Sequence, residues 1–212
     1  MTSMPLTAFF SRFLLPVLAL AATLAAAPSQ AADAEATIRS LVQQVSTDLD
    51  KLYKAGRIND RAAVEHLINT DIMPTVDKER LTRRVFRQYW KQITEAGREA
   101  DAQQRVVAAV TRTYAVALSS YSGDTLSVVD VNERKNNTVA KTRIRRPNGQ
   151  TIQVDFSLTE TDGKWLINDM AVDGIVVSLT LFNAMKSVWD TQGMDAALAT
   201  LATTDVQKTG KK

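Results

Sequence analysis

One stretch near the C-terminal end, Gly163–Gly193, restricts the possible folds more than any other part of the sequence. It contains a strand pattern over Lys164–Val172, an Asp173-Gly174 corner, and an apolar helix pattern that starts near Ser178. Ser178 is predicted to cap this helix, because a serine hydroxyl can accept a hydrogen bond from an unpaired amide of the first turn. Gly193 stands where the end of a helix favours a left-handed residue. We therefore expect a buried helix that lies against a sheet.

The helix after that corner carries a wide apolar stripe. Its apolar residues recur close to the i, i+3, i+4, i+7 spacing of one helical face, and they are Ile175, Val176, Leu179, Phe182, Met185, Val188 and Trp189. So broad a stripe needs a large apolar surface to face. That surface can be another helix or a sheet, or part of the stripe can line a cavity.

The first 31 residues have the three parts of a secretory signal peptide. Residues 1–12 carry one basic side chain, Arg12, and residues 13–27 form an almost unbroken apolar run. Ser29 and Ala31 place small residues at the −3 and −1 positions of a cleavage site. The run is too short for a comfortable membrane span, which needs about 20 residues. We expect cleavage near Ala31 and export to a bacterial periplasm.

The composition narrows the possible chemistry. The chain has no cysteine, which excludes disulfides, thiolate metal sites, cysteine nucleophiles and an acylated N-terminal cysteine. A net charge of +3 at pH 7 says little about partners by itself. The 212 residues leave room for one domain of ordinary size, expected over residues 32–202, followed by a flexible polar tail over residues 203–212.

The first half of the exported chain is expected to be helical. Helical periodicity covers residues 37–55, a shorter segment after Asp60, residues 78–94 and residues 101–121. The third of these segments has an apolar half and a basic stripe of Arg80, Arg84, Arg87 and Lys91. With Lys141, Arg143, Arg145 and Arg146, this stripe either meets anionic head groups or an acidic partner, or is simply a solvated face.

After Gly123 the apolar period changes from 3.6 to 2, which indicates strands. The clearest strand covers residues 152–159, and shorter patterns cover residues 126–131, 138–146 and 164–172. Turn signals separate the last three strands, so they should form an antiparallel meander with one apolar and one wet face. The expected fold is α+β, with helices packed on one face of a curved antiparallel sheet.

Motifs of the common enzyme classes are absent. The sequence contains no nucleophile elbow, phosphate loop or dinucleotide fingerprint, and its acids lack metal-ligand spacing. His66, the single histidine, is interpreted as a structural or surface residue. One enzyme hypothesis stays open: a small cup-shaped fold with Asp155 or Asp169 as general base and Tyr114 or Tyr121 as oxyanion donor. Strand parity weakens it, because Asp155 should lie on the wet face. A further alternative is a lipid-free interaction or chaperone module that uses the basic stripe.

Several short motifs are informative through their combined order. They are Ile72-Met73-Pro74-Thr75-Val76-Asp77, Gln88-Tyr89-Trp90, Tyr114-x3-Leu118-x2-Tyr121, Pro147-Asn148-Gly149, Val154-Asp155-Phe156, Trp165-x3-Asp169-x4-Gly174 and Gly193-Met194-Asp195. In this order and spacing they resemble the MlaC, or toluene-tolerance Ttg, family from about residue 37 to residue 201. One segment departs from the family pattern: Gln103–Val110 has Val and Ala where the family tends to carry Phe.

The resemblance implies a soluble periplasmic phospholipid carrier of the Mla pathway, with no reaction and no cofactor. Such a carrier exchanges lipid with an outer-membrane lipoprotein complex and with the substrate-receiving domain of an inner-membrane ABC transporter. It thereby maintains outer-membrane lipid asymmetry, and with it tolerance to organic solvents. A shuttle works most simply as a monomer. A related branch linked to hopanoid transport keeps a polycyclic lipid as an alternative cargo.

The resemblance also implies an apolar cavity between the sheet and the helices that holds the acyl chains, with the head group near solvent. The expected pocket residues are Phe86, Tyr89, Tyr114, Leu118, Ile152, Val154, Phe156, Met170, Ile175, Leu179 and Phe182. The expected docking residues for a head group or partner are Arg80, Arg84, Arg87, Lys91, Arg143 and Arg145.

Overall fold

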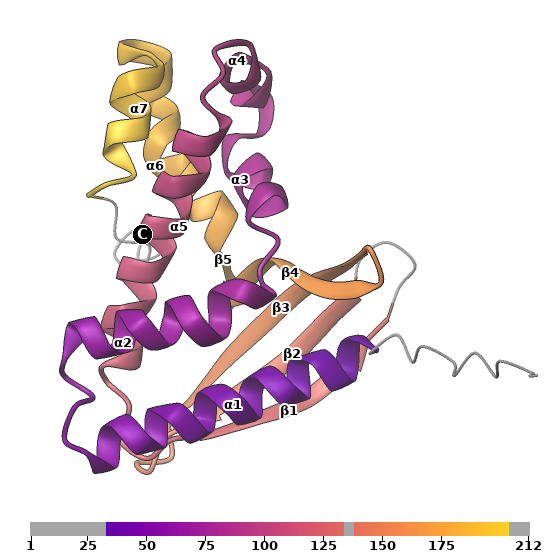
Figure 1. Ribbon diagram of the computed structural model, residues 1–212, viewed down its shortest axis with the longest axis vertical. Coiled ribbons are helices and arrows are strands. Elements are labelled where there is room, and N and C mark those ends of the chain that lie inside the picture. Colours follow the sequence, from indigo (N-terminus) through magenta and orange to yellow (C-terminus); the bar gives the residue numbers. More distant parts are fainter. Residues whose placement is uncertain (1–32, 134–137, 204–212) are drawn as a thin grey trace, which may run out of the picture. The chain divides into compact units, whose positions relative to one another are not determined.

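The computed structural model describes residues 33–133 and 138–203, and Figure 1 shows how its elements are arranged. The expected signal peptide and all of the expected tail beyond Thr203 lie outside the described residues. The described part is an α+β fold with an antiparallel sheet. Its strands are β1 (Thr125–Asn132), β2 (Thr138–Arg145), β3 (Thr151–Thr161), β4 (Lys164–Val172) and β5 (Ile175–Val176).

The sheet has the order β1-β2-β3-β4-β5, so every strand pairs with its neighbour in sequence. This confirms the predicted meander. The pairing brings Thr142 opposite Val154 and Ile144 opposite Ile152. Because side chains alternate between the two faces of a strand, these residues share one face of the sheet.

The helical segments come mostly before the sheet. They are α1 (Ala34–Lys54), α2 (Arg61–Leu67), the π-helical turn η1 (Ile68–Ile72), the 3₁₀ turn η2 (Met73–Thr75), α3 (Lys78–Phe86), the 3₁₀ turn η3 (Arg87–Tyr89), α4 (Trp90–Glu95) and α5 (Glu99–Leu118), and after the sheet α6 (Val177–Gln192) and α7 (Met194–Thr200). Helix α1 packs along β1 and β2, whereas α3 and α6 pack against β4 and each other (Figure 1).

Aspartate side chains begin the first three helices. Asp33, Asp60 and Asp77 each accept a hydrogen bond from the amide three residues later, at N···O distances of 2.5, 3.2 and 2.9 Å. Each of these contacts satisfies an amide that has no partner within its helix, a stabilisation of about 1 kcal/mol. The starting points of α1, α2 and α3 are thus fixed by neighbouring residues in the sequence.

The segment predicted as one helix over residues 78–94 is divided in the structure. Arg87 has φ +46° and ψ −116°, which ends α3 and starts η3. After this turn the Tyr89 ring stacks on Trp189, with 4.6 Å between ring centroids. The prediction of a continuous helix was wrong because Leu81, Val85, Tyr89 and Ile93 keep an i, i+4 spacing across the break.

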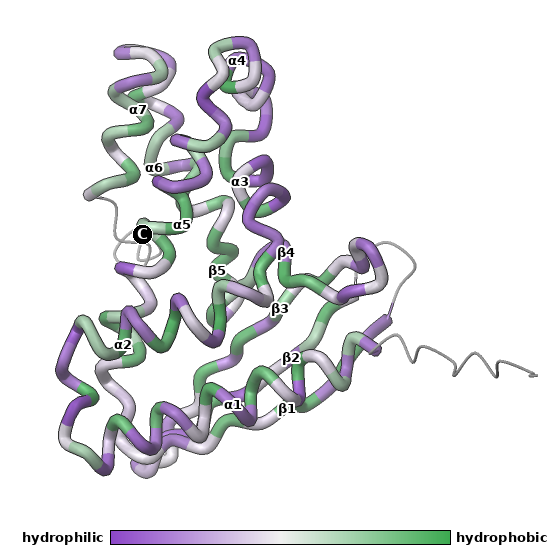
Figure 2. The backbone as a smooth tube through the Cα atoms, viewed as in Figure 1, coloured by the Kyte–Doolittle hydropathy of each residue, from purple (hydrophilic) through white to green (hydrophobic). Residues whose placement is uncertain are grey.

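The core follows the amphipathic pattern of the elements. Figure 2 shows hydrophobic and hydrophilic residues alternating along α1 and along the strands. Ile38 and Leu49 of α1, Phe86 of α3, and Leu181 and Met185 of α6 are at most 1% exposed. Each of these helices therefore buries one side against the rest of the protein.

Candidate functional site

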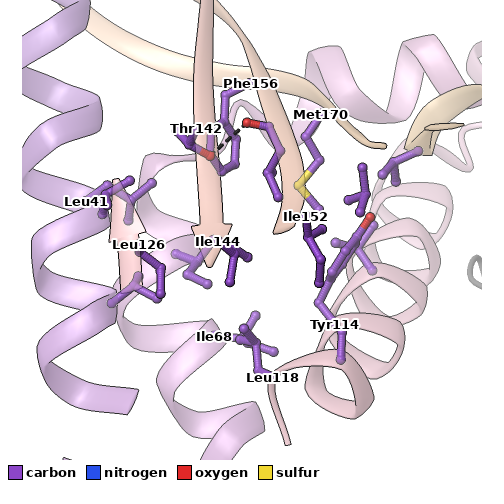
Figure 3. A pocket seen from close by; sticks show the side chains of 18 of the residues that line it. Leu41, Ile68, Tyr114, Leu118, Leu126, Thr142, Ile144, Ile152, Phe156 and Met170 are labelled. Atoms are coloured by element: carbon purple, nitrogen blue, oxygen red, sulfur yellow. Dashed lines mark hydrogen bonds between the residues drawn. The ribbon is translucent and has the colours of Figure 1, made fainter. Parts of the chain in front are cut away.

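A cavity of about 780 Å³ lies between the sheet and the helices. Its volume is within the range of roughly 300–1,000 Å³ that is typical of small-molecule sites. Most of its lining side chains are aliphatic, and Figure 3 shows them converging from opposite walls. The cavity is therefore suited to an apolar ligand of considerable size.

The sheet wall of the cavity comes from the inward face of β2, β3 and β4. Ile144, Ile152, Val154, Phe156 and Met170 line this wall. Thr142 lies among them, but its hydroxyl is satisfied because it donates to the Val154 carbonyl at 2.7 Å (Figure 3). Because the Thr142 hydroxyl is bonded within the sheet, it offers no free donor to the cavity, and the wall remains largely apolar.

An irregularity in β4 gives this wall an extra inward residue. Ser157 pairs with Asp169 whereas Leu158 pairs with Ile167, so Asn168 is an extra residue on β4. Such a bulge changes which residues alternate inward. As a result Ile167 and Met170, which are three residues apart, both line the cavity.

The opposite wall is helical. Leu41, Val45 and Leu49 of α1 lie four residues apart, as do Val110, Tyr114 and Leu118 of α5, and both sets line the cavity. Residues at i and i+4 lie one above the other on a helix. Ile68 and Ile72 of η1 close the wall between these two helices.

Asp169 is a buried acid at the junction of β4 and α6. It is 5% exposed, and its Oδ1 accepts hydrogen bonds from the Met170 and Ser178 amides at 2.9 and 3.2 Å. Its Oδ2 accepts a bond from the Ser178 hydroxyl at 2.6 Å. The Arg84 Nη1 lies 4.0 Å from the same oxygen, so this carboxylate joins β4, α6 and α3.

The prediction that Ser178 caps the helix was therefore wrong. Helix α6 begins at Val177, and Ser178 lies inside its first turn. Its amide is satisfied by the carboxylate of Asp169 from the neighbouring strand. A negative charge at this position is also favourable because the positive end of the helix dipole lies there.

Tyr114 brings a polar group into the helical wall. Burial, and secondarily the negative charge of Asp169, raise the pKa of its hydroxyl above the ordinary range. The phenol therefore stays protonated at neutral pH. It can donate a hydrogen bond to an uncharged acceptor, such as an ester carbonyl, but it is not an anion.

Exposed residues mark the mouth of the cavity. Val116 comes from the last turn of α5 and Ser120 from the turn after it, Gln150 from the β2–β3 turn, Asp173 from the corner between β4 and β5, and Ile175 from the start of β5. Val116 and Ile175 are 53% and 39% exposed. The cavity thus opens to solvent through a rim that mixes apolar and polar side chains.

The structure brings seven of the eleven predicted pocket residues together. These residues line the cavity: Tyr114, Leu118, Ile152, Val154, Phe156, Met170 and Ile175. Phe86, Tyr89, Leu179 and Phe182 do not. Leu179 is 39% exposed on α6, because the apolar stripe of that helix is wider than the surface that it covers.

The other three form an aromatic cluster with Trp189, and we use this name for Phe86, Tyr89, Phe182 and Trp189. Tyr89 stacks on Trp189 and Phe182, and Phe86 meets Trp189 edge-on, with 6.0 Å between centroids. The Tyr89 hydroxyl donates to Asp190 at 2.5 Å. These rings fill the space between α3, η3 and α6 with one another, which corrects their assignment to the pocket.

The predicted docking residues lie in two places. Arg80 pairs with Asp77 at 3.0 Å, Lys91 with Glu95 at 3.6 Å, and the Arg87 guanidinium lies 5.2 Å from the Phe182 ring centroid. Because the helix is divided at Arg87, these residues and Arg84 do not form one straight stripe. Arg143 borders the cavity, whereas Arg145 is exposed outside it. Their role in docking remains a prediction.

Several lining residues were missed by sequence reasoning. They include Leu41, Val45, Ile68, Val110, Leu126 and Ile144. Their apolar periodicity was visible, but the same pattern is typical of any packed helix or strand. Whether an apolar face lines a cavity or a packed core depends on the distance between facing elements, and that distance is known only from the fold.

Of the residues in the enzyme hypothesis, Tyr114, Tyr121 and Asp169 line the cavity, whereas Asp155 does not. Asp155 pairs with Lys141 across the sheet, on the face opposite Phe156. Asp169 is held by Ser178, and the Tyr121 ring meets Tyr53 edge-on at 5.7 Å. His66 is exposed. Over residues 33–133 and 138–203 no acidic or histidine cluster could hold a metal ion, and no helix is both long and apolar enough to cross a bilayer.

Comparisons with known proteins agree with this architecture. The sequence model of a family described as MlaC protein matches residues 35–203. Among solved structures, a phospholipid-binding protein from Ralstonia solanacearum, determined in complex with a phospholipid, superposes with a TM-score of 0.70. The two chains are 22% identical, and the match covers 85% of this chain and 100% of the other. At this identity the likeness shows a shared fold.

Proposed function

The chain belongs to the MlaC protein family, and we propose from this membership and from the cavity that it binds a phospholipid and carries it. The observation on which the proposal rests is the apolar cavity of about 780 Å³ that is partly open to solvent. Acyl chains would occupy the space between α1, α5 and the sheet. The head group would lie at the mouth, among the polar residues of the turns.

The energetics of such a cavity favour a carrier. Each buried CH₂ group contributes about 0.8 kcal/mol, so an acyl chain gains in the cavity about what it loses when it leaves a membrane. Loading is then close to an exchange between two apolar phases. Direction must come from the partners, and the exchange requires no catalytic residue.

We further propose the compartment and the partners. Residues 1–31 would direct export and residues 32–202 would form the lipid-binding domain in the periplasm. The carrier would then exchange phospholipid with an outer-membrane lipoprotein complex and an inner-membrane ABC transporter. Arg80, Arg84, Arg87, Lys91 and Arg143 are the basic side chains proposed to meet a head group or a partner. Arg145 is exposed outside the cavity, so it is proposed to meet a partner.

Native mass spectrometry of exported protein, purified without detergent, tests the proposal. We expect a stoichiometric adduct that solvent extraction identifies as a phospholipid. A hopanoid in its place would contradict the phospholipid assignment while retaining the cavity. Protein that is folded, lipid-free and thermally unaffected by added phospholipid would contradict the carrier proposal altogether.

A further inference from the structure

Arg146 occupies a fixed position at the mouth of the cavity. It follows β2 directly, and strand alternation places it on the same side as Thr142 and Ile144. It lines the cavity. Its amide donates to the Gln150 carbonyl and its carbonyl accepts from the Gly149 amide, both at 2.9 Å. The tight turn therefore holds the backbone from which this side chain extends.

The side chain of Arg146 is only partly satisfied. Its Nη2 donates to the Ser120 hydroxyl oxygen at 3.0 Å, which ties it to the end of α5. Its Nε is buried, yet among the described residues it has no hydrogen-bond acceptor. A buried donor without an acceptor loses the hydrogen bonds that it makes to water in the unfolded chain, and the loss is greater when the donor is charged. Such a group needs an explanation.

Arg146 also differs from those arginines of the protein that pair with a carboxylate. Arg39, Arg57, Arg61, Arg83 and Arg105 each have a carboxylate partner within 3 Å. Within the described residues Arg146 makes no such ion pair. Its cation thus stands at the edge of an apolar cavity with unused donors.

The carboxylates at this end of the cavity are engaged elsewhere. Asp124 accepts a hydrogen bond from the Ser122 hydroxyl at 3.0 Å, and Asp173 accepts one from the Gln153 amide at 2.8 Å. They line the cavity, so an anion should prefer the side of the mouth that Arg146 occupies. Ser120 and Gln150 stand beside it as uncharged polar residues.

We propose that Arg146 recognises the phosphate group of the bound lipid, an inference that rests on the proposed function. A guanidinium presents its donors in a planar fork that matches phosphate oxygens, and Nε with one Nη is a bidentate pair. The phosphate would satisfy the unpaired Nε while the acyl chains continue along Ile144 and Ile152. Arg146 thereby makes the cavity selective for lipids that carry a phosphate.

Arg145 offers a matched control. It is the preceding residue, it is exposed, and it does not line the cavity. Arg146→Gln and Arg145→Gln remove the same charge from adjacent positions. A difference between the two variants therefore reports the site and not the net charge of the protein.

The experiment compares phosphatidylglycerol with diacylglycerol of the same acyl chains, each offered from vesicles, with bound lipid counted by native mass spectrometry. We expect wild type and Arg145→Gln to favour phosphatidylglycerol by tenfold or more. Arg146→Gln should lose this preference while it binds diacylglycerol as wild type does, and Arg146→Lys should keep part of it. Because the readout is a ratio within one protein, a change in stability does not imitate the effect.

Other outcomes separate this inference from the function on which it rests. An unchanged preference in Arg146→Gln overturns the role of Arg146 and leaves lipid binding standing. Wild type that takes up neither lipid overturns the proposed function. Glycerol phosphate, which has no acyl chains, should not displace the lipid. If it binds as tightly as phosphatidylglycerol, the mouth is a site for free phosphate and the inference fails.

Discussion

The cavity and the aromatic cluster are two apolar regions built from the same kinds of pattern, but only one of them is filled. In the aromatic cluster, four rings occupy the space between α3, η3 and α6, with centroids as close as 4.6 Å. In the cavity, mostly aliphatic side chains surround an unfilled volume of about 780 Å³. The contrast indicates that one region is a scaffold and the other is reserved for a ligand.

Truncation should be far more costly in the packed region than in the cavity wall. Phe86 is fully buried, and Phe86→Ala should lower the free energy of unfolding by about 3–5 kcal/mol. Ile144→Ala should cost less than about 2 kcal/mol, because its half-buried side chain already faces empty space. Chemical denaturation of delipidated protein measures both. Equal costs would show that the cavity wall is packed as tightly as the cluster.

A charge placed in the sheet wall should reduce lipid binding without removing the fold. Ile152→Glu puts a carboxylate opposite Ile144 with no partner, and an unpaired charge strongly disfavours an apolar neighbour. We expect at least a tenfold loss of co-purified lipid, which corresponds to about 1.4 kcal/mol.

Ile175→Glu sharpens this test, because Ile175 is 39% exposed at the mouth. There the carboxylate can reach water, so a smaller loss is expected. If Ile175→Glu abolishes lipid retention and Ile152→Glu leaves it intact, acyl chains do not lie along the inner sheet.

Neutralising Asp169, the carboxylate of β4 that contacts α6 and α3, should have the smallest effect on stability. Asp169→Asn weakens the bonds from Ser178 and its amide, and we expect a loss of about 1 kcal/mol in the free energy of unfolding. Asp155→Asn is the control, because the Asp155 carboxylate is bonded to the Gln153 side chain of its own strand, and it should change stability by less than about 0.5 kcal/mol. A difference of less than 0.5 kcal/mol between them would show that Asp169 does not hold α6 against β4.

The fold was predictable where the apolar pattern of a single helix or strand shows which of its sides is buried. The change of period after Gly123 and the turn at Pro147-Asn148-Gly149 predicted the meander, and the structure has it. The break at Arg87 and the bulge at Asn168 were not predicted. Both leave the local apolar pattern intact, because they change the direction of side chains and not their identity.

The site was predictable only in part for the same reason. Tyr114 and Leu118 line the cavity, and Phe182 does not, although all three lie on apolar helix faces. Whether such a face meets a neighbour or a hollow depends on how far apart two elements lie. The acceptor for the first turn of α6 was also not predicted, because Asp169 is nine residues away from Ser178 in the sequence.

A photoreactive phospholipid tests the central claim most directly, because a diazirine in its acyl chain labels whatever side chains surround that chain. After loading, irradiation and digestion, mass spectrometry locates the labelled residues. Labels on α1, α5 and the inner face of β2 and β3, with Ile144, Ile152 and Leu118 among them, are the predicted result. Labels concentrated on the aromatic cluster, with none on the cavity wall, would contradict the proposal that the hollow region holds the lipid.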